Sequence, residues 1–375
     1  MKKYLLIMAV AALALTSCSS DETIAVNQSD SINFRSLTNN LTRAADIESA
    51  NDLKSFNVFA QKSDDNSDYI GTSSTGSSES FVSNGSGTYT SASKHYWPAS
   101  GNLDFYAWSA NSTANGNKET SVTAAAYNIY DVTVPFTAAD QPDFIYASNF
   151  GQAKVTPVAL TFNHYESRIV LKVKNTASNL NFVVTGWKIV YPDNAGTITF
   201  SGFSTGTTRT ATWSANTIQS VDNEFVSMVT STNIAANTTT AAQLGTGPQQ
   251  MIMIPQETVG STPPALAYLG TGGTYKLNRA YIAIEYSATG SNTITSGWRC
   301  WPLPANTTWE QGKQYTYIID IADGGYKELD PNDGSTDPEP ELANSLIQFA
   351  SITVTDWITD LNGNSTDDDD IEAGM

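Results

Sequence analysis

Residues 158–173, VALTFNHYESRIVLKV, carry the clearest strand signals in this chain of 375 residues. Val158, Leu160 and Phe162 alternate with small or polar residues, and residues 169–173 then form a nearly continuous apolar run. Alternation is typical of a strand with one buried face, whereas a short apolar run bounded by polar residues is typical of a strand buried on both faces. This stretch therefore predicts two successive β-strands.

The same two patterns recur along most of the chain from residue 53 onward, separated by Gly, Asn, Ser or Pro. No window carries a long apolar stripe of helical period, and one short helix is expected over residues 46–54. Strands are expected at 56–60, 80–82, 103–108, 132–136, 143–147, 182–191, 197–203, 251–254, 275–286 and 314–321. Many short strands joined by long polar loops indicate an all-β protein built from antiparallel β-sandwiches.

The first residues have the composition of an export signal. Lys2 and Lys3 precede an apolar run at 4–15, which is shorter than the roughly 20 residues that a membrane-spanning helix needs. Leu15-Thr16-Ser17-Cys18 follows and resembles a bacterial lipobox. We therefore predict a lipoprotein signal peptide over 1–17, with lipidation of Cys18 by acyl chains such as palmitate. The alternative is an ordinary signal peptide followed by a chance cysteine.

The charge of the chain is strongly negative and unevenly placed. The chain holds 19 Lys and Arg against 37 Asp and Glu, and 15 of these acids lie within residues 320–375, where Lys327 is the one basic residue. A negative surface repels the phosphates of nucleic acids, so the composition disfavours nucleic acid as a partner.

The residue pattern does not predict an enzyme or a metal protein. The chain has two histidines, His95 and His164, without the spacing of a zinc site. His164 lies near Glu166 and Arg168, yet a second catalytic element is missing, so a structural histidine is expected. Cys300 has no nearby base to activate it and is expected to be a small strand residue. We therefore expect no catalytic residue, no metal and no cofactor.

The tryptophans allow a second hypothesis about function, which is glycan binding. Trp97, Trp108, Trp187, Trp213 and Trp298 can stack on sugars if their rings are exposed. Most of them lie in alternating runs, where core packing is the ordinary explanation. A surface lipoprotein that binds glycans through exposed aromatic residues is therefore the alternative to a structural subunit.

Several segments in order along the chain resemble one known family, the fimbrillin-like proteins of Bacteroidales, which are pilus lipoproteins related to FimA and Mfa fimbriae. The matching pieces are the lipobox at Cys18, FNVFA at 56–60, YWP and LDFYAW within 96–108, QPDFIYAS at 141–148, VALTFNHYESRIVLKV at 158–173, MIMIPQ at 251–256, WEQGKQYTYIIDI at 309–321 and IQFASITVTDW at 347–357. Each piece alone is weakly specific, but the ordered set covers nearly the whole chain.

The resemblance implies two transthyretin-like β-sandwich domains in tandem and a route of assembly. The route is export as a lipoprotein to the surface of the outer membrane, proteolytic cleavage between Arg43 and Ala44, and polymerisation by β-strand exchange. Cleavage would remove a first strand near residues 32–37. The partners implied are other fimbrial subunits, as a homopolymer or heteropolymer, and ligands on host or bacterial surfaces. The Asp-rich C-terminal tail departs from the family pattern.

Together these observations divide the chain into five predicted parts. They are the signal peptide at 1–17, a tether and removable leader at 18–43, an N-terminal β-sandwich at 44–155, a C-terminal β-sandwich at 156–359 that includes a linker at 329–341 and a last strand at 346–358, and an acidic disordered tail at 360–375.

The last strand is the candidate assembly strand. Its apolar residues are Ile347, Phe349, Ile352, Val354 and Trp357. Such a strand can complete its own domain or insert into a neighbour, because both outcomes use the same main-chain pairing. The acidic tail beyond residue 359 favours the first outcome, since a neighbour's groove would have to accommodate it.

Overall fold

The computed structural model describes residues 31–36, 53–112, 116–117, 122–202, 210–215, 219–244, 250–258, 268–271, 274–305, 307–328, 338–342 and 346–357. The short helix expected over 46–54 lies almost wholly outside these residues. Strands dominate the described part, and two short 3₁₀ segments, η3 (Ala138–Asp140) and η4 (Ile321–Asp323), are present. No helix among the described residues is long and apolar enough to cross a bilayer. The all-β prediction is confirmed.

The first sheet contains nine strands and curls around its own core. In spatial order they are β12 (Val158–Leu160), β1 (Phe34–Ser36), β5 (Thr88–Ser91), β4 (Glu79–Ser83), β2 (Ser55–Lys62), β6 (Leu103–Ser109), β11 (Ile145–Gln152) and β13 (Asn163–His164), with β3 (Asp68–Ile70) beside β2. β12 and β13 lie at opposite ends of this order, yet only Thr161 and Phe162 join them. The sheet must therefore bend back on itself, and it encloses a cluster rich in Phe side chains.

A second, four-stranded sheet covers the other face of β2, β6 and β11. Its order is β17 (Thr210–Ala215), β16 (Ala195–Ser201), β10 (Ile129–Thr133) and β9 (Val122–Ala126). Phe59 and Tyr106 of the first sheet belong to one buried cluster with Tyr130 and Phe200 of the second. Because β2 is buried on both faces, its sequence SFNVFAQK carries apolar residues at adjacent positions.

Two further sheets form a sandwich in the C-terminal half. One has the order β19 (Thr238–Gln243), β14 (Ser167–Asn175), β27 (Lys313–Asp320) and β29 (Ser351–Asp356), with β20 (Gln250–Met253) also paired to β14. The other has the order β18 (Ser220–Ile234), β15 (Leu180–Tyr191), β24 (Tyr281–Gly290), β25 (Ile294–Pro302) and β28 (Tyr326–Lys327). Apolar side chains from both sheets, including Trp187 and Tyr317, form the largest core cluster.

Three two-stranded ribbons complete the described strands. They are β7 (Asn111–Ser112) with β8 (Gly116–Asn117), β21 (Gln256–Glu257) with β26 (Thr308–Trp309), and β22 (Tyr268–Thr271) with β23 (Thr274–Leu277).

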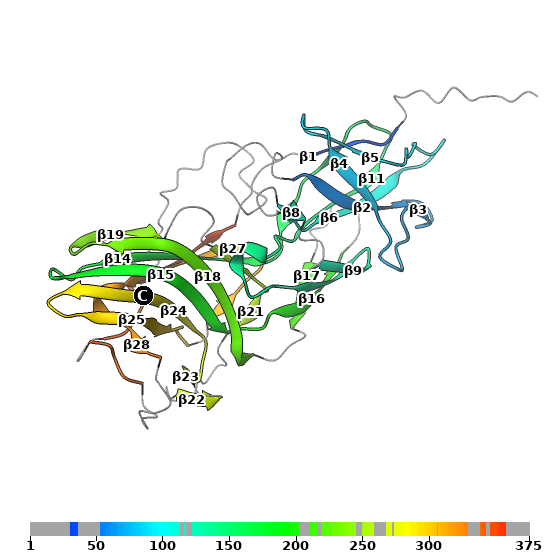
Figure 1. Ribbon diagram of the computed structural model, residues 1–375. Coiled ribbons are helices and arrows are strands. Elements are labelled where there is room, and N and C mark those ends of the chain that lie inside the picture. The colour runs from blue at the N-terminus through cyan, green and yellow to red at the C-terminus, as the bar shows by residue number, and fades with distance from the viewer. Residues whose placement is uncertain are drawn as a thin grey trace, which may run out of the picture.

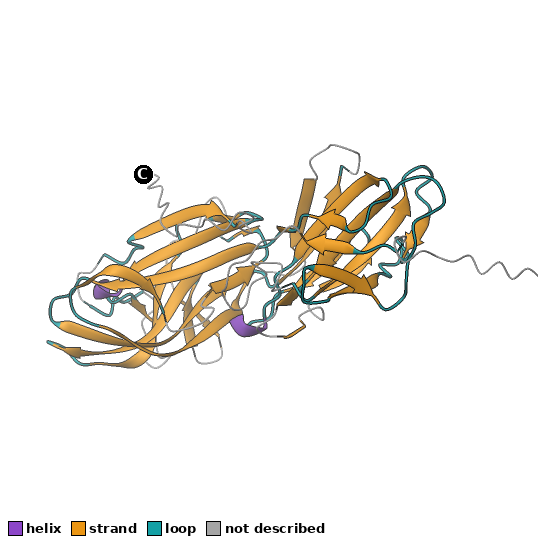
Figure 2. Ribbon diagram, turned by 90° about the horizontal axis from the view of Figure 1, so that it is seen from above, coloured by secondary structure: helices purple, strands orange, loops and turns teal. Residues whose placement is uncertain are grey.

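The strands gather into two lobes (Figures 1 and 2). The predicted domain boundary between residues 155 and 156 falls between β11 and β12, which both belong to the first sheet. β16, from beyond that boundary, also pairs with β10 from before it, and β17 pairs with β16 in the same sheet. Main-chain pairing therefore joins the two sides of the boundary, and the division into domains stays a prediction.

The last strand is shorter in the structure than the predicted 346–358. β29 covers Ser351–Asp356 and pairs with β27, whereas residues 346–350 form no strand. Residues 346–350 are nevertheless placed by side-chain packing, because Ile347 and Phe349 lie against the C-terminal core.

Candidate functional site

The first strand of the described chain lies inside a sheet and not at its edge. Phe34 of β1 is opposite Val158 of β12 in a parallel pairing and opposite Tyr89 of β5 in an antiparallel one. Two further main-chain hydrogen bonds extend this pairing. The Ile32 amide donates to the His95 carbonyl, and the Val158 amide donates to the Asn33 carbonyl, each over 2.8 Å. β1 is therefore bonded along both of its edges.

Phe34 lies at the centre of an aromatic cluster. Its side chain is 0% exposed, and its ring makes edge-on contacts with Phe56, Phe81 and Phe105 at centroid distances of 5.8, 4.7 and 5.2 Å. We call the space that these three rings enclose the Phe34 pocket. If β1 left the sheet, the pocket would be empty and the facing edges of β12 and β5 would have unpaired main-chain groups. This gap between β12 and β5 is called the β1 slot below.

The C-terminal strand is much more exposed than β1. β29 is the edge strand of its sheet, and Ile352 and Val354 are 36% and 52% exposed. They pair with Tyr317 and Tyr315, whose side chains belong to the C-terminal core. Ile352 and Val354 therefore project on the core side of the sheet but at its open edge. Unlike β1, β29 has one neighbouring strand among the residues that the structure describes.

The residues before β29 are held by a small number of contacts. Phe349 packs at 5.1 Å from the Tyr317 ring, and the Ala350 amide donates to the Ile318 carbonyl over 2.8 Å. The Gln348 amide donates to the Asp323 carboxylate. Ile347 and Phe349 are only partly buried, and Leu346 is 73% exposed.

One residue anchors the end of this segment. Trp357 is 5% exposed, and its indole stacks on the His164 imidazole at a centroid distance of 4.0 Å and an angle of 7°. His164 is fixed in turn by a 2.8 Å contact between its Nδ1 and Asp143 Oδ1. The Trp357 amide donates to the Gly312 carbonyl. Trp357 is the one buried residue of the segment 346–357.

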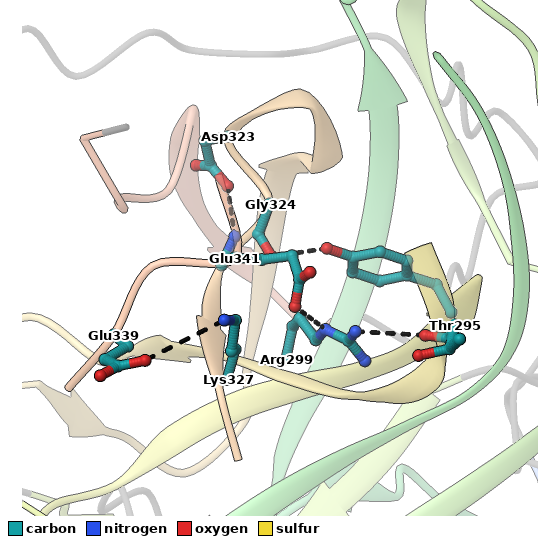
Figure 3. Close-up of polar contacts among 9 residues, drawn as sticks. Thr295, Arg299, Asp323, Gly324, Lys327, Glu339 and Glu341 are labelled. Atoms are coloured by element: carbon teal, nitrogen blue, oxygen red, sulfur yellow. Dashed lines mark hydrogen bonds and ion pairs between the residues drawn. The ribbon is translucent and has the colours of Figure 1, made fainter. Parts of the chain in front are cut away.

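A polar cluster holds the chain between β28 and this segment. Residues 338–342 lie against β25 and β28 through ion pairs from Arg299 to Glu341, at 2.8 Å, and from Lys327 to Glu339, at 4.0 Å (Figure 3). Asp323 lies nearby and accepts hydrogen bonds from the Trp301 indole and the Gly325 amide. Burial raises the pKa of Asp323 to about 7, because desolvation of the carboxylate outweighs these hydrogen bonds.

The structure describes some of the predicted site residues and not others. Cys18, Arg43 and Ala44 lie outside the described residues, so lipidation and cleavage stay predictions. Ile347, Phe349, Ile352, Val354 and Trp357 are all described, but they do not share one environment: two are half-buried, two lie at an open edge and one is buried.

A first strand was expected near residues 32–37, but neither the Phe34 pocket nor the contact of His164 with Trp357 was predicted from the sequence. Phe56, Phe81 and Phe105 lie in three separate strand signals, and no local pattern indicates that these strands meet around Phe34. The residues that form the second contact lie at two distant points of the chain, within FNHYESR and TVTDW, and no spacing rule connects them.

The aromatic residues considered for glycan binding are mostly enclosed. Trp97, Trp108 and Trp187 are 7%, 5% and 0% exposed, and the Trp213 indole donates to the Tyr165 carbonyl. Trp298 is half-buried, with Lys188 Nζ 4.5 Å from its ring centroid.

The polar groups around Lys188 do not form an activated nucleophile. Lys188 Nζ lies 2.8 Å from Glu328 and 3.3 Å from Glu224, and the Tyr281 hydroxyl donates to Glu328 over 3.1 Å. Burial raises the pKa of the Cys300 thiol well above its ordinary value, so this cysteine stays protonated. Among the described residues no group of three or more His, Cys, Asp or Glu side chains is arranged to hold a metal ion.

Comparison with known families gives one match. A family model described as fimbrillin-like matches residues 42–357. No curated protein sequence matches the chain.

Solved structures with a similar arrangement include proteins of Bacteroides and Porphyromonas species. A protein described as a candidate cell adhesion protein of Bacteroides ovatus is 16% identical, with a TM-score of 0.46 over 88% of this chain and 98% of that one. A similarly described protein of Bacteroides uniformis is 15% identical, with a TM-score of 0.43 and the same shares covered. The tip fimbrial protein Mfa3 of Porphyromonas gingivalis is 11% identical, with a TM-score of 0.39 over 88% of this chain and 99% of that one. The assignment of this chain to a family therefore rests on the family model and not on these structures.

Proposed function

We propose that this chain, which belongs to the fimbrillin-like family, is a structural or accessory subunit of a cell-surface fimbria and contributes to adhesion. In this proposal it has no enzymatic activity. It is exported as a lipoprotein, anchored to the outer membrane through Cys18 and exposed at the cell surface. Its partners are other fimbrial subunits, of the same or a different kind, and through the filament the surfaces of host or bacterial cells.

The interior position of β1 is the observation that supports assembly by strand exchange. Cleavage between Arg43 and Ala44 would separate Cys18 and β1 from the rest of the chain. Loss of β1 would leave the Phe34 pocket empty and the edges of β12 and β5 unpaired. A strand from another subunit can satisfy both by β-augmentation, since main-chain hydrogen bonds provide affinity and side-chain pockets provide specificity.

The same geometry explains why the uncleaved chain would stay a monomer. In the precursor β1 occupies the slot of its own molecule. Because β1 is covalently attached, its effective concentration at the slot is higher than that of a strand from another subunit. Cleavage changes this balance without any change in the core of the body.

The proposal is tested with full-length precursor that is purified folded and then treated with a trypsin-like protease. We expect early cleavage between Arg43 and Ala44, read by mass spectrometry of the new N-terminus, followed by filaments in electron micrographs. The matched control is Arg43→Ala, which should stay intact at this site and monomeric. Filaments from the uncleaved control, or cleaved protein that stays monomeric at high concentration, would contradict the proposal.

A further inference from the structure

The turn between β4 and β5 contains an asparagine followed by a glycine. It consists of residues 84–87, which read NGSG. The Asn84 amide donates to the Thr88 carbonyl over 2.9 Å and closes the turn. Gly85 has a φ of 81°, a left-handed conformation that glycine adopts without strain. The Asn84 side chain is therefore attached to a turn of defined geometry.

The side-chain oxygen of Asn84 accepts three hydrogen bonds within this turn. The Ser86 amide and the Ser86 hydroxyl each donate to Asn84 Oδ1 over 2.9 Å, and the Thr88 amide donates to it over 3.3 Å. Donors placed in this way polarise a carbonyl group and stabilise negative charge that develops on its oxygen, as the donors of an oxyanion hole do. The Asn84 Cγ carbon is thus prepared for attack by a nucleophile.

The nearest nucleophile along the chain is the main-chain nitrogen of Gly85. Its N–H donates to the Ser83 hydroxyl over 3.1 Å, so a proton acceptor is already in contact with it. Gly85 has no Cβ that would hinder the approach of its nitrogen to the preceding side chain. Asn84, Gly85 and Ser86 are all exposed, and water therefore has access to the turn.

We propose that Asn84 is a site of spontaneous deamidation and that the folded turn accelerates this reaction. The Gly85 nitrogen forms a bond to Asn84 Cγ and loses its proton to water through the Ser83 hydroxyl. The bond between Cγ and Nδ2 then breaks, and ammonia leaves with a proton from water, which produces a cyclic succinimide. Water opens this ring at either carbonyl and leaves aspartate or isoaspartate at position 84. The net reaction consumes one water and releases one ammonia.

A second exposed turn provides an internal comparison. Asn66 lies between β2 and β3 with a φ of 56°, and it is exposed like Asn84. The residue after it is Ser67, whose side chain hinders the approach of the main-chain nitrogen. The Ser67 amide also donates to the Asp65 carboxylate over 2.8 Å. We therefore expect Asn66 to react much more slowly than Asn84 in the same molecule.

The modification would change the molecule at a point close to β1. Isoaspartate adds one carbon to the main chain between positions 84 and 85, and both products add a negative charge. The adjacent pair of the β4–β5 ladder is Ser83 with Tyr89, and Tyr89 is also opposite Phe34 of β1. The inference does not rest on the proposed function, because the reaction needs neither cleavage nor assembly.

The test compares the folded chain with the same sequence outside the fold. Precursor that carries Arg43→Ala is incubated at neutral pH and physiological temperature beside a synthetic peptide of residues 79–91. The peptide is the control, because an isolated two-stranded hairpin is at best marginally stable in water. Peptide mass mapping measures deamidation at each asparagine, and labelling by an isoaspartyl methyltransferase measures isoaspartate.

We expect Asn84 to deamidate at least threefold faster in the folded precursor than in the peptide. Asn66 in the same sample should stay unmodified over the same time. A rate at Asn84 that is equal in the two samples, or lower in the folded precursor, would overturn the inference.

Two serine variants test the contacts that carry the argument. Ser83→Ala removes the proton acceptor and Ser86→Ala removes one of the three donors, so each should slow the reaction at Asn84 at least twofold. Ser93→Ala, at an exposed position outside the turn, is the matched control and should leave the rate unchanged. Thermal unfolding verifies that each variant is folded. Equal rates in all three variants would overturn the inference, and filament formation by cleaved wild-type protein remains a separate test of the proposed function.

Discussion

Trp357 stacks on His164 at a centroid distance of 4.0 Å, and this contact connects the C-terminal strand to the first sheet. His164 belongs to β13, which pairs with β11, whereas Trp357 follows β29 of the C-terminal sandwich. Asp143 fixes the imidazole through Nδ1. Since every other residue of the segment 346–357 is exposed or half-buried, Trp357 is the main side-chain anchor of that segment.

Truncation of this anchor should loosen the C-terminal strand. Trp357→Ala removes a buried aromatic ring, and such changes cost about 3–5 kcal/mol of unfolding free energy. We expect a clear loss of thermal stability and faster amide hydrogen exchange over Ser351–Asp356. The control is Ile352→Ala, at a 36% exposed position, for which we expect about 1 kcal/mol or less. Unchanged exchange over β29 in the Trp357 variant would show that other contacts hold the strand.

The Phe34 pocket should matter in the precursor and not in the cleaved body. Phe34→Ala empties a pocket that is 0% exposed, so we expect a loss of about 3–5 kcal/mol in the full-length chain. Arg35→Ala, at the next and exposed position, is the matched control and should change stability little. After cleavage at Arg43, bodies from wild type and from Phe34→Ala have the same sequence and should unfold identically. A precursor that tolerates Phe34→Ala without loss would place β1 outside the stable fold.

The sequence predicts the all-β class and many strands because alternation is a local property. β27, for example, covers Lys313–Asp320 where a strand was expected over 314–321. The chain also signals the extended character of residues 32–34 through Ile32 and Phe34. These features depend on residues that are close together along the chain, where the period of apolar residues is informative.

The arrangement of those strands could not be predicted in the same way. The parallel pairing of β1 with β12 joins residues from distant parts of the chain, and nothing in either segment specifies the other. The exposed edge of β29 was also missed, because Ile352 and Val354 have the pattern of buried residues. Side chains of an edge strand are buried only if the other sheet of the sandwich covers them, and this depends on the whole fold.

Asp323 should make stability depend on pH. Its pKa is about 7 in the folded chain against 3.8 ordinarily, so the folded state binds more protons between these values. The free energy of unfolding should therefore fall as pH rises from about 4 to 7, by at most about 1.4 kcal/mol per pH unit from this group. Asp323→Asn removes this contribution, so its stability relative to wild type should increase over that range.

The measurement for Asp323 is chemical denaturation at several pH values from 4.5 to 7.5. Asp222→Asn, at an exposed position, removes the same charge and controls for the change in net charge. If the stabilities of wild type and Asp323→Asn change in parallel with pH, the titration of Asp323 does not contribute.

Membrane attachment should depend on one side chain. Cys18 is the acceptor of the predicted lipid, so Cys18→Ala should abolish acylation and release the protein from the outer-membrane fraction. Metabolic labelling with a fatty-acid analogue and membrane fractionation measure the two effects separately. Cys300→Ala is the control, because that thiol is buried in the body and should not affect the anchor. Retention of the Cys18 variant in the membrane through its N-terminus would contradict lipoprotein export.

Deletion of the C-terminal segment separates its role in the monomer from its role in assembly. A precursor that lacks residues 343–375 loses the β29 pairing with β27, the Trp357 anchor and the half-buried Ile347 and Phe349. Full burial of each large side chain contributes roughly 1.5–3 kcal/mol, so we expect a lower melting temperature in a chain that still folds. A precursor that lacks only residues 358–375 keeps all of these contacts and should melt as wild type does.

The two truncated precursors should also differ after cleavage at Arg43. The precursor that lacks residues 343–375 retains the β1 slot but lacks the candidate assembly strand. It should therefore form no filaments alone, and it should end filaments of wild-type protein when the two are mixed. Filament length against the fraction of truncated protein is the measurement, and we expect it to fall steeply. The chain that lacks residues 358–375 should copolymerise without shortening the filaments. If the shorter chain has an unchanged melting temperature, the segment is not an integral strand of the monomer. If it forms filaments alone, the candidate assembly strand is not required for assembly.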